Sequence, residues 1–402
     1  MNYDVLEIRR HFPALETEVG GHPLVYLDNA ATAQMSDLVA DMVRRQEQRR
    51  GNVHRGIHHL SEETTWAYEQ ARRTVAEFIH ADPSQIVFTA GTTDGINRIA
   101  WAFGMNRKGG QTALTTCMEH NSNFLPWQQL CRRTHTPFDP VRLTADGELD
   151  MEDLRRKLTG DVALLAVTHC SNVHGAVNDI REICSLAHAR NIPVLIDAAQ
   201  SICHMDLDVR ELGCDYLVFS GHKLGAPFGI GVLYCRAPMP PVFFGGGMVQ
   251  TVSLGDADYM DFPYSWEAGT PNVSGAIGLA AAISFRRSLQ QDWQLWEQRL
   301  LRQAEEGLRM IAGVRILGSP RQRLGSLSFV MEGAHPFDAA KLADCYGIAL
   351  RSGHHCAPIL LQSLGCTYSL RISPNFYNTE EEIAFFLETM NRINCLIKNS
   401  RG

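Results

Sequence analysis

Length, composition and charge set the first limits on this protein. The chain has 402 residues, 45% of them hydrophobic and 20% charged, which is typical of a soluble globular protein. Because this length exceeds one ordinary core, we expect two domains. The formal net charge of -7 argues against a nucleic-acid partner, and the longest apolar stretch, residues 275–285, is too short to span a bilayer.

The N-terminus and the cysteines indicate the compartment. Charged and apolar residues mix from the first residues onward, so no signal peptide is visible. The eleven cysteines are scattered and form no C-x-x-C pair, which removes the usual zinc-ribbon and dithiol patterns. We therefore expect a cytoplasmic protein in which most thiols are reduced and buried.

Apolar runs and helical patterns alternate through the first part of the chain. Apolar runs open the segments 85–103, 161–172, 192–201 and 214–223, and helical patterns follow. Strands without inside–outside alternation, separated by helices, indicate a mostly parallel sheet covered on both faces. This pattern predicts an α/β core.

The pattern changes near residue 275. One long helical stretch over residues 276–313 precedes shorter strand candidates at 325–331 and 347–353. A last helix is expected over 379–399, where Thr379 and Glu382 have the spacing of a capping box. The succession of helix, small sheet and helix predicts a smaller α+β domain.

Polar residues stand where the apolar runs of the first domain end. In open α/β sheets, ligands bind outside the carboxyl ends of the strands, so we expect these side chains to share one site. Each could alone be an ordinary helix cap or surface residue. The set comprises Gly91-Thr92-Thr93, Ser171-Asn172, Asp197 with Gln200, and Ser220-Gly221-His222-Lys223.

Together these groups match the needs of pyridoxal 5'-phosphate. A phosphate suits the helix N-terminus at Thr92 and Thr93, where free N–H groups and the helix dipole favour an anion. The ring nitrogen needs an anionic partner such as Asp197, and the aldehyde needs a lysine such as Lys223 for a Schiff base. Two neighbours of the lysine can add phosphate donors, Ser220 and His222.

A second cluster of reactive residues lies in the segment 349–360. Cys356 follows His354 and His355, with Arg351 close by, in a glycine-containing stretch between a strand and a helix pattern. Such polar surroundings favour a nucleophilic thiolate over an inert buried cysteine. A metal site is the competing interpretation, but adjacent residues rarely converge on one ion and no paired spacing supports it.

These motifs resemble those of one family, the group II (SUF-type) cysteine desulfurases. That group includes the selenocysteine lyases and belongs to the class V aminotransferase fold. The resemblance runs in order from about residue 5 to residue 395 and rests on the following stretches: YLDNAAT (26–32), NVHRGIH (52–58), GTT-GIN (91–97), MEHNSNFLPW (118–127), SNV-G (171–175), SGHK (220–223), EAGTPN (267–272) and RSGHHCA (351–357).

The resemblance implies a fold and a role for each matched residue. The fold would be that of the fold type I PLP-dependent transferases, with an N-terminal segment (1–20) packed on the small domain, a large PLP-binding domain (21–275) and a small domain (276–402) carrying the cysteine loop. Lys223 would bind the cofactor and move the substrate Cα proton, His120 would stack on the ring and assist, and Cys356 would accept sulfur as a persulfide. The remaining matched residues would hold cofactor or substrate: Asp197, Gln200, Thr92, Thr93, Ser220 and His222 for the cofactor, Thr270 reaching the cofactor phosphate of a second subunit, and Asn172, Arg371 and Arg351 at the substrate carboxylate or thiol.

Several positions depart from the family pattern. Leu224 to Gly229 read Leu-Gly-Ala-Pro-Phe-Gly where the family usually has Leu-Tyr-Gly-Pro-Thr-Gly, and Asn121-Ser122 replaces His-Ala. Ala90 stands where arginine is common, and Pro358-Ile359 where Met/Gln-Pro is more usual. The mechanistic lysine, aspartate, histidine, arginine and cysteine are all present, so the departures bear on substrate, rate and partner.

The leading hypothesis is a homodimeric L-cysteine desulfurase that passes sulfur to a SufE-like acceptor for iron–sulfur cluster assembly. The alternative keeps the cofactor but changes the substrate, as in a selenocysteine lyase or a pathway-specific C–S lyase or aminotransferase-like enzyme. A non-catalytic Cys/His metal-binding protein fits less well. A nicotinamide-dependent oxidoreductase fits least, because Gly229-Ile230-Gly231 is too short a part of a dinucleotide fingerprint.

Overall fold

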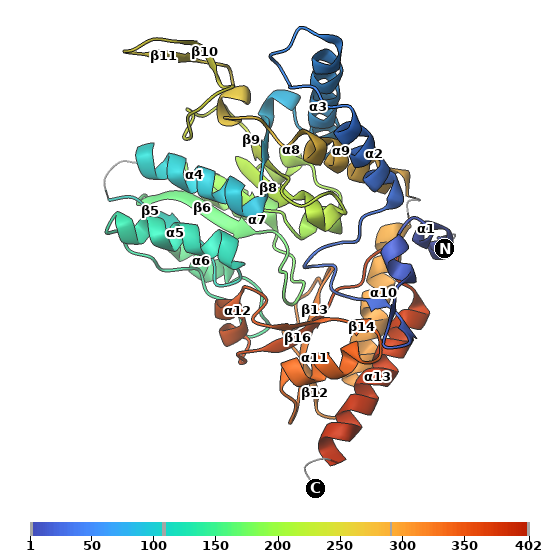
Figure 1. Ribbon diagram of the computed structural model, residues 1–402. Coiled ribbons are helices and arrows are strands. Elements are labelled where there is room, and N and C mark those ends of the chain that lie inside the picture. Colours follow the sequence, from blue (N-terminus) through green and yellow to red (C-terminus); the bar gives the residue numbers. More distant parts are fainter. Residues whose placement is uncertain (1–2, 107–109, 290–291, 400–402) are drawn as a thin grey trace.

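A computed structural model describes residues 3–106, 110–289 and 292–399. Its centre is a large sheet with the strand order β4-β9-β8-β7-β6-β5 (Figure 1). Only β9 runs antiparallel to its neighbours, so the expected mostly parallel α/β sheet is confirmed. The strands are β4 (Ile86–Thr89), β5 (Thr112–Leu114), β6 (Val162–Thr168), β7 (Val194–Asp197), β8 (Tyr216–Ser220) and β9 (Gly231–Cys235).

Helices cover both faces of this sheet, which explains why its strands do not alternate in polarity. In β8, Leu217 and Phe219 join the core under one layer of helices, while Val218 joins the core on the opposite face. One face is covered by α4 (Thr92–Asn106) and α5 (Asn121–Arg133). The other face packs against α3 (His59–Phe78), α7 (Ile180–His188) and α9 (Val273–Ser288).

The second domain is built on an antiparallel sheet of order β12-β13-β16-β15, as the sequence pattern predicts for an α+β unit. The strands are β12 (Val314–Ile316), β13 (Leu327–Met331), β15 (Arg351–Gly353) and β16 (Ser369–Ile372). Helices of this domain are α10 (Trp293–Arg309), α11 (Pro336–Asp344), α12 (Pro358–Ser363) and α13 (Glu380–Asn399). The capping box of α13 is present, since Thr379 and Glu382 each accept a hydrogen bond from the other's backbone N–H, at 3.2 and 3.0 Å.

The packing differs from the expected domain limits in two places. The single helical stretch expected over 276–313 is two helices, and the buried residues of the first, α9, belong to the core of the large sheet. Near the other limit, β3 (Val25–Tyr26) pairs in parallel with β14 (Ile348–Ala349), and Val25 and Leu27 pack in the core of the small domain. An apolar face can be buried against either core, and only the tertiary contacts decide which.

The N-terminal segment lies against the small domain. Tyr3 donates a hydrogen bond to the Phe376 carbonyl at 2.9 Å, and Arg9 donates to the Tyr377 carbonyl at 2.9 Å. The remaining elements lie at the edges of the two domains. They are α1 (Val5–Arg9), β1 (Glu18–Val19), β2 (His22–Pro23), α2 (Asp37–Gln48), α6 (Met151–Lys157), α8 (Val209–Leu212), β10 (Val249–Val252) and β11 (Ala257–Tyr259).

Among the described residues, no helix combines the length and apolar character needed to cross a bilayer.

Candidate active site

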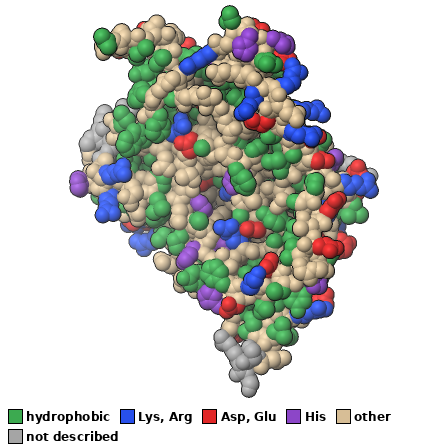
Figure 2. Space-filling view, in the orientation of Figure 1, with side chains coloured by type: hydrophobic (Ala, Val, Ile, Leu, Met, Phe, Trp, Pro, Cys, Tyr) green, Lys and Arg blue, Asp and Glu red, His purple; other side chains and the backbone are tan. Residues whose placement is uncertain are grey.

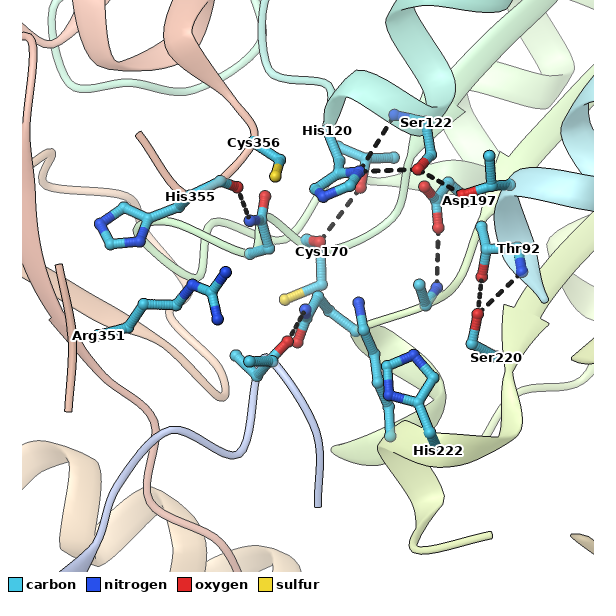
Figure 3. Close-up of a pocket in the computed structure, with 18 of the residues that line it drawn as sticks. Thr92, His120, Ser122, Cys170, Asp197, Ser220, His222, Arg351, His355 and Cys356 are labelled. Carbon is cyan, nitrogen blue, oxygen red and sulfur yellow. Dashed lines mark hydrogen bonds between the residues drawn. The ribbon is translucent and has the colours of Figure 1, made fainter. Parts of the chain in front are cut away.

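One cavity of about 230 Å³ gathers nearly all of the predicted site residues. It lies between the carboxyl ends of the large-sheet strands and the loop that follows β15 in the small domain (Figure 3). The predicted residues that line it are Thr92, Thr93, His120, Asn172, Asp197, Gln200, Ser220, His222, Lys223, Arg351, Cys356 and Arg371. Thr270 does not line this cavity.

The N-terminus of α4 forms a cradle of hydroxyl and N–H groups. Thr92 lies at its first turn, and both its backbone N and its Oγ1 are 2.8 Å from Ser220 Oγ. Thr93 Oγ1 is 2.7 Å from Ser122 Oγ. Beside them, His222 Nδ1 is buried and has no hydrogen-bond partner among the described residues. Hydroxyls, a free ring nitrogen and a helix N-terminus together provide the donors that an anionic group needs.

Asp197 and Lys223 place opposite charges at the base of the cavity. Asp197 ends β7 and accepts a hydrogen bond from Ala199 N at 2.9 Å. Burial raises the pKa of Asp197, and Lys223 opposes that shift. Burial lowers the pKa of Lys223, against the pull of Asp197. A lysine held in this way reaches its neutral, nucleophilic form more easily than an exposed lysine does.

His120 is held as a neutral imidazole at the start of α5. Its Nδ1 accepts a hydrogen bond from Ser122 N at 3.1 Å, which places the ring proton on Nε2. Burial lowers the pKa of His120 to about 3, and the cationic Lys223 and Arg371 add to the effect. The ring can therefore exchange a proton without carrying a permanent charge.

Arg371 supplies a buried cation from β16. Its Nη2 donates to Asp28 Oδ1 at 2.7 Å and its Nη1 to the Asn172 carbonyl at 2.9 Å, while Nε has no hydrogen-bond partner among the described residues. Arg351 reaches the same carboxylate, with Nη1 3.5 Å from Asp28 Oδ2. Two guanidinium groups anchored by one carboxylate leave a net positive charge, suited to a small carboxylate ligand.

Cys356 lies on an exposed loop between β15 and α12, at the edge of the cavity. Its carbonyl accepts a hydrogen bond from Asn121 N at 2.7 Å, and its thiol points toward the side where His120 lies (Figure 3). His355 does not favour the Cys356 thiolate as expected. Its ring points away from the thiol, with Nε2 2.8 Å from Ser369 Oγ, and burial lowers the pKa of His355 to about 3. His355 therefore brings no positive charge to the thiol.

The metal interpretation gains no support from this arrangement. Within residues 3–106, 110–289 and 292–399, no group of three or more His, Cys, Asp or Glu side chains is placed to hold a metal ion. All eleven cysteines are free thiols.

Thr270 lies in a different pocket of about 130 Å³, with Asn52, His54 and Arg55. The loop that carries it begins at Glu267, whose side chain is only 7% exposed and accepts a hydrogen bond from Phe88 N at 2.7 Å. A threonine in this position cannot be assigned to the cavity of its own chain.

Several residues in or beside the cavity were not predicted. Asp28, which holds Arg371 from beside the cavity, was not singled out, although it lies within the quoted YLDNAAT stretch, because its role depends on a partner more than 300 residues later. Ser122, Thr168 and Cys170 also line the cavity. Beneath them, Glu119 accepts hydrogen bonds from Thr116 Oγ1, Thr168 N and Asn123 Nδ2 at 2.6, 2.9 and 2.6 Å; no motif in the sequence indicates this network.

An apolar groove of about 700 Å³ runs from Cys356 along α4 and α5. Hydrophobic side chains gather on this part of the surface (Figure 2), including Trp101, Met105 and Leu125, all of them exposed. The groove shares Thr93, His120, Ser122 and Cys356 with the cavity, so the two are continuous.

Comparisons with known proteins agree with this geometry. The aminotransferase class-V family matches residues 25–386. A protein from Halalkalibacterium halodurans named "Probable cysteine desulfurase" is 42% identical over 388 residues, covering 94% of this chain and 95% of that protein. The cysteine desulfurase of Salmonella agona is 41% identical over 407 residues, with coverage of 99% and 100%.

Solved structures show the same similarity. The apo cysteine desulfurase from Thermococcus onnurineus NA1 superposes with a TM-score of 0.92 at 36% identity, covering 99% of both chains. The cysteine desulfurase CsdA from Escherichia coli gives a TM-score of 0.91 at 34% identity, covering 98% of this chain and 100% of that one. On the strength of its full-length match and its shared fold, this chain is a member of the aminotransferase class-V family of enzymes.

Proposed function

We propose that this enzyme is a PLP-dependent cysteine desulfurase. The net reaction converts L-cysteine and the Cys356 thiol into L-alanine and a Cys356 persulfide. The C–S bond of the substrate breaks, an S–S bond forms on Cys356, and no external oxidant or reductant is needed. The observation that carries the proposal is the convergence of Lys223, Asp197 and Cys356 on one cavity from two domains.

The residues of the cavity fit pyridoxal 5'-phosphate. The cradle at Thr92 and Ser220, together with the unpartnered His222 Nδ1, suits its phosphate, and Asp197 suits its ring nitrogen. Lys223 lies where an amine is needed to bind the aldehyde. When bound, this cofactor supplies an aldehyde that captures an amino group and a ring that withdraws electrons from the substrate Cα.

The chain's own groups then divide the work of binding and proton transfer. Arg371 and Asn172 orient the substrate by its carboxylate, and Arg351 adds positive charge beside the thiol. Lys223, whose burial favours the neutral amine, removes the Cα proton and returns one to the product. His120 assists as a neutral acid–base group whose Nε2 carries the proton.

The exposure of Cys356 suits delivery of sulfur to another protein. Its place on an exposed loop lets an acceptor thiol reach the persulfide. A SufE-like carrier that feeds iron–sulfur cluster assembly in the cytoplasm is the partner we propose. We also propose a homodimer in which Thr270 completes the phosphate site of the second subunit, because that threonine lies outside the cavity of its own chain.

The decisive experiment mixes the holoenzyme with L-cysteine and measures alanine together with persulfide mapped by mass spectrometry. The wild-type protein should form alanine and a persulfide at Cys356 in equal amounts. Cys356→Ala should keep the cofactor but lose both products, whereas Cys395→Ala, which removes another exposed thiol, should behave as wild type. Alanine formation by C356A at the wild-type rate would contradict the persulfide mechanism. A cofactor-loaded wild-type enzyme that forms neither product would point to a different substrate.

A further inference from the structure

A second cavity, of about 430 Å³, is lined by residues of both domains. Its walls come from the end of α3, from the segment after β7, from the end of α9 with Leu289, and from the first turn of α10. Apolar contacts are offered by Phe78, Ile202, Met205 and Leu289, and the cavity shares no lining residue with the active-site cavity.

The unusual member of this wall is Arg286, a cation that is 4% exposed. Its guanidinium lies 4.1 Å from the centre of the Trp293 ring and 5.2 Å from that of Phe376. Nε and Nη2 are buried without a hydrogen-bond partner among the described residues, and the closest carboxylate, Glu297, is 3.8 Å from Nη2. That ion pair is long and neither Nε nor Nη2 makes a hydrogen bond among the described residues, so the buried guanidinium keeps unmet hydrogen-bonding capacity, which is costly.

Glu297 is shared with two other groups and gives Arg286 only this long contact. Its Oε2 is 2.8 Å from His204 Nδ1, and its Oε1 accepts a hydrogen bond from Phe376 N at 2.9 Å. Among the described residues the remaining guanidinium nitrogen, Nη1, makes no hydrogen bond and is not one of the fully buried unpartnered atoms, so it is the nitrogen left for an occupant of the cavity that Arg286 lines.

Two cations and one carboxylate line the cavity. Arg286 and Arg287 line it, against one carboxylate, Asp206. Arg287 also lies 3.5 Å from Glu77, which takes up part of its charge. The aliphatic and aromatic walls select an occupant with an apolar body, and a planar guanidinium favours a carboxylate as its polar end.

We propose that this cavity is a binding site for a small organic carboxylate with an apolar body. The carboxylate bonds to Arg286 Nη1, and the body packs on Met205, Ile202 and Trp293. This site is separate from the proposed catalytic function and does not depend on it. The cavity nevertheless lies near the active site. Ile202, which lines the cavity, is followed by Cys203, whose Sγ is 3.2 Å from the Lys223 carbonyl oxygen.

The test uses benzoate as the probe and fluorine NMR of the full-length holoenzyme labelled with 5-fluorotryptophan. Trp293 lines the proposed site and Trp101 lines the groove beside Cys356, so the two resonances separate this site from carboxylate binding near the active site. Trp293→Phe identifies the reporter resonance. We expect benzoate to shift the Trp293 resonance saturably, and the uncharged isostere benzamide to bind about tenfold more weakly or less.

Variants then test the role of the arginine. Arg286→Met removes the charge with little loss of volume and should weaken benzoate binding about tenfold or more. Arg309→Met, which removes an exposed arginine of α10, should leave binding unchanged. Gln294→Trp fills the cavity with Arg286 intact and should also abolish the benzoate-induced shift of the Trp293 resonance. This variant tests the site if R286M does not fold. No response of Trp293 in the wild type, a response confined to Trp101, or unchanged affinity in R286M would each overturn the proposal.

Discussion

The buried pair Arg72–Glu267 offers the sharpest test of how this fold is held together. Arg72 is 1% exposed and lies over the rings of Tyr68, Phe88 and Tyr264. The Glu267 carboxylate accepts hydrogen bonds from Nη1 and Nη2 of Arg72, at 2.7 and 2.9 Å, and from Tyr68 Oη at 2.8 Å. This pair ties α3 and β4 to the loop that carries Thr270.

Glu267→Leu removes the carboxylate and leaves the arginine buried. Breaking a buried ion pair by losing one partner costs about 3–5 kcal/mol. We expect about 3 kcal/mol, the lower end, because Arg72 keeps Glu69, 3.1 Å from its Nε, and the Ile86 carbonyl, 2.7 Å from its Nη1. Arg72→Met should cost a similar amount, since it leaves Glu267 buried without its cation.

The double variant R72M/E267L removes both charges and should be destabilised by clearly less than the sum of the single variants. We expect a coupling energy of about 2 kcal/mol or more. Urea unfolding followed by circular dichroism and tryptophan fluorescence gives the four free energies of unfolding. Arg44→Ala, which breaks an exposed pair with Asp41, is the control and should change stability by about 0.5 kcal/mol or less. Additive single effects, with coupling below about 0.5 kcal/mol, would refute this account of the pair.

Three further predictions follow from the site and the core. Asp28→Asn removes the carboxylate that orients Arg371, so the KM for L-cysteine should rise about tenfold with a smaller fall in kcat. An unchanged KM in steady-state kinetics would contradict this role. Gly231→Ala would press a methyl group against the backbone of the turn before α4, so it should lower stability by about 1–3 kcal/mol and weaken cofactor binding. The control Gly255→Ala places its methyl group in open space and should change neither property. Thermal unfolding measures the stability, and cofactor titration measures the binding. Burial lowers the pKa of His174 to about 4 from the ordinary 6.5. Between about pH 4 and pH 6.5 this histidine is protonated in the unfolded chain but neutral in the folded one, so the free energy of unfolding should rise with pH over that range. His174→Gln should reduce that slope by about 1.4 kcal/mol per pH unit, and an unchanged slope in unfolding experiments at several pH values would argue against a buried neutral histidine.

Much of the large domain could be predicted because its signals are local. Each strand of the sheet is an uninterrupted apolar run, and the carboxyl ends of parallel strands must meet at one edge. Asp197 and Lys223 follow neighbouring strands, so their proximity was predictable without any knowledge of long-range contacts. β9 was not singled out, because a short glycine-flanked apolar run gives no sign that it inserts antiparallel between β8 and β4.

The small domain's share of the site could be inferred only from the resemblance of its motifs to a family. Cys356 follows β15 and Arg371 lies within β16 of a separate sheet, and no periodicity indicates which edge of that sheet faces the large domain. The resemblance placed both residues at the substrate, and the structure brings both into the same cavity as Lys223.

The sequence by itself determined the fold class, the strand-end residues and the family, since these depend on hydrophobic periodicity and on motifs that occupy a few consecutive residues. Tertiary structure alone decided that Asp28 pairs with Arg371, that His355 turns away from the thiol and that α9 belongs to the large domain. It also decided that Arg286 is buried beside a cavity with its Nε and Nη2 lacking hydrogen-bond partners among the described residues. Each of these depends on which surfaces meet across hundreds of residues, and a side chain's partners, burial and pKa are set by those contacts rather than by its neighbours in the chain.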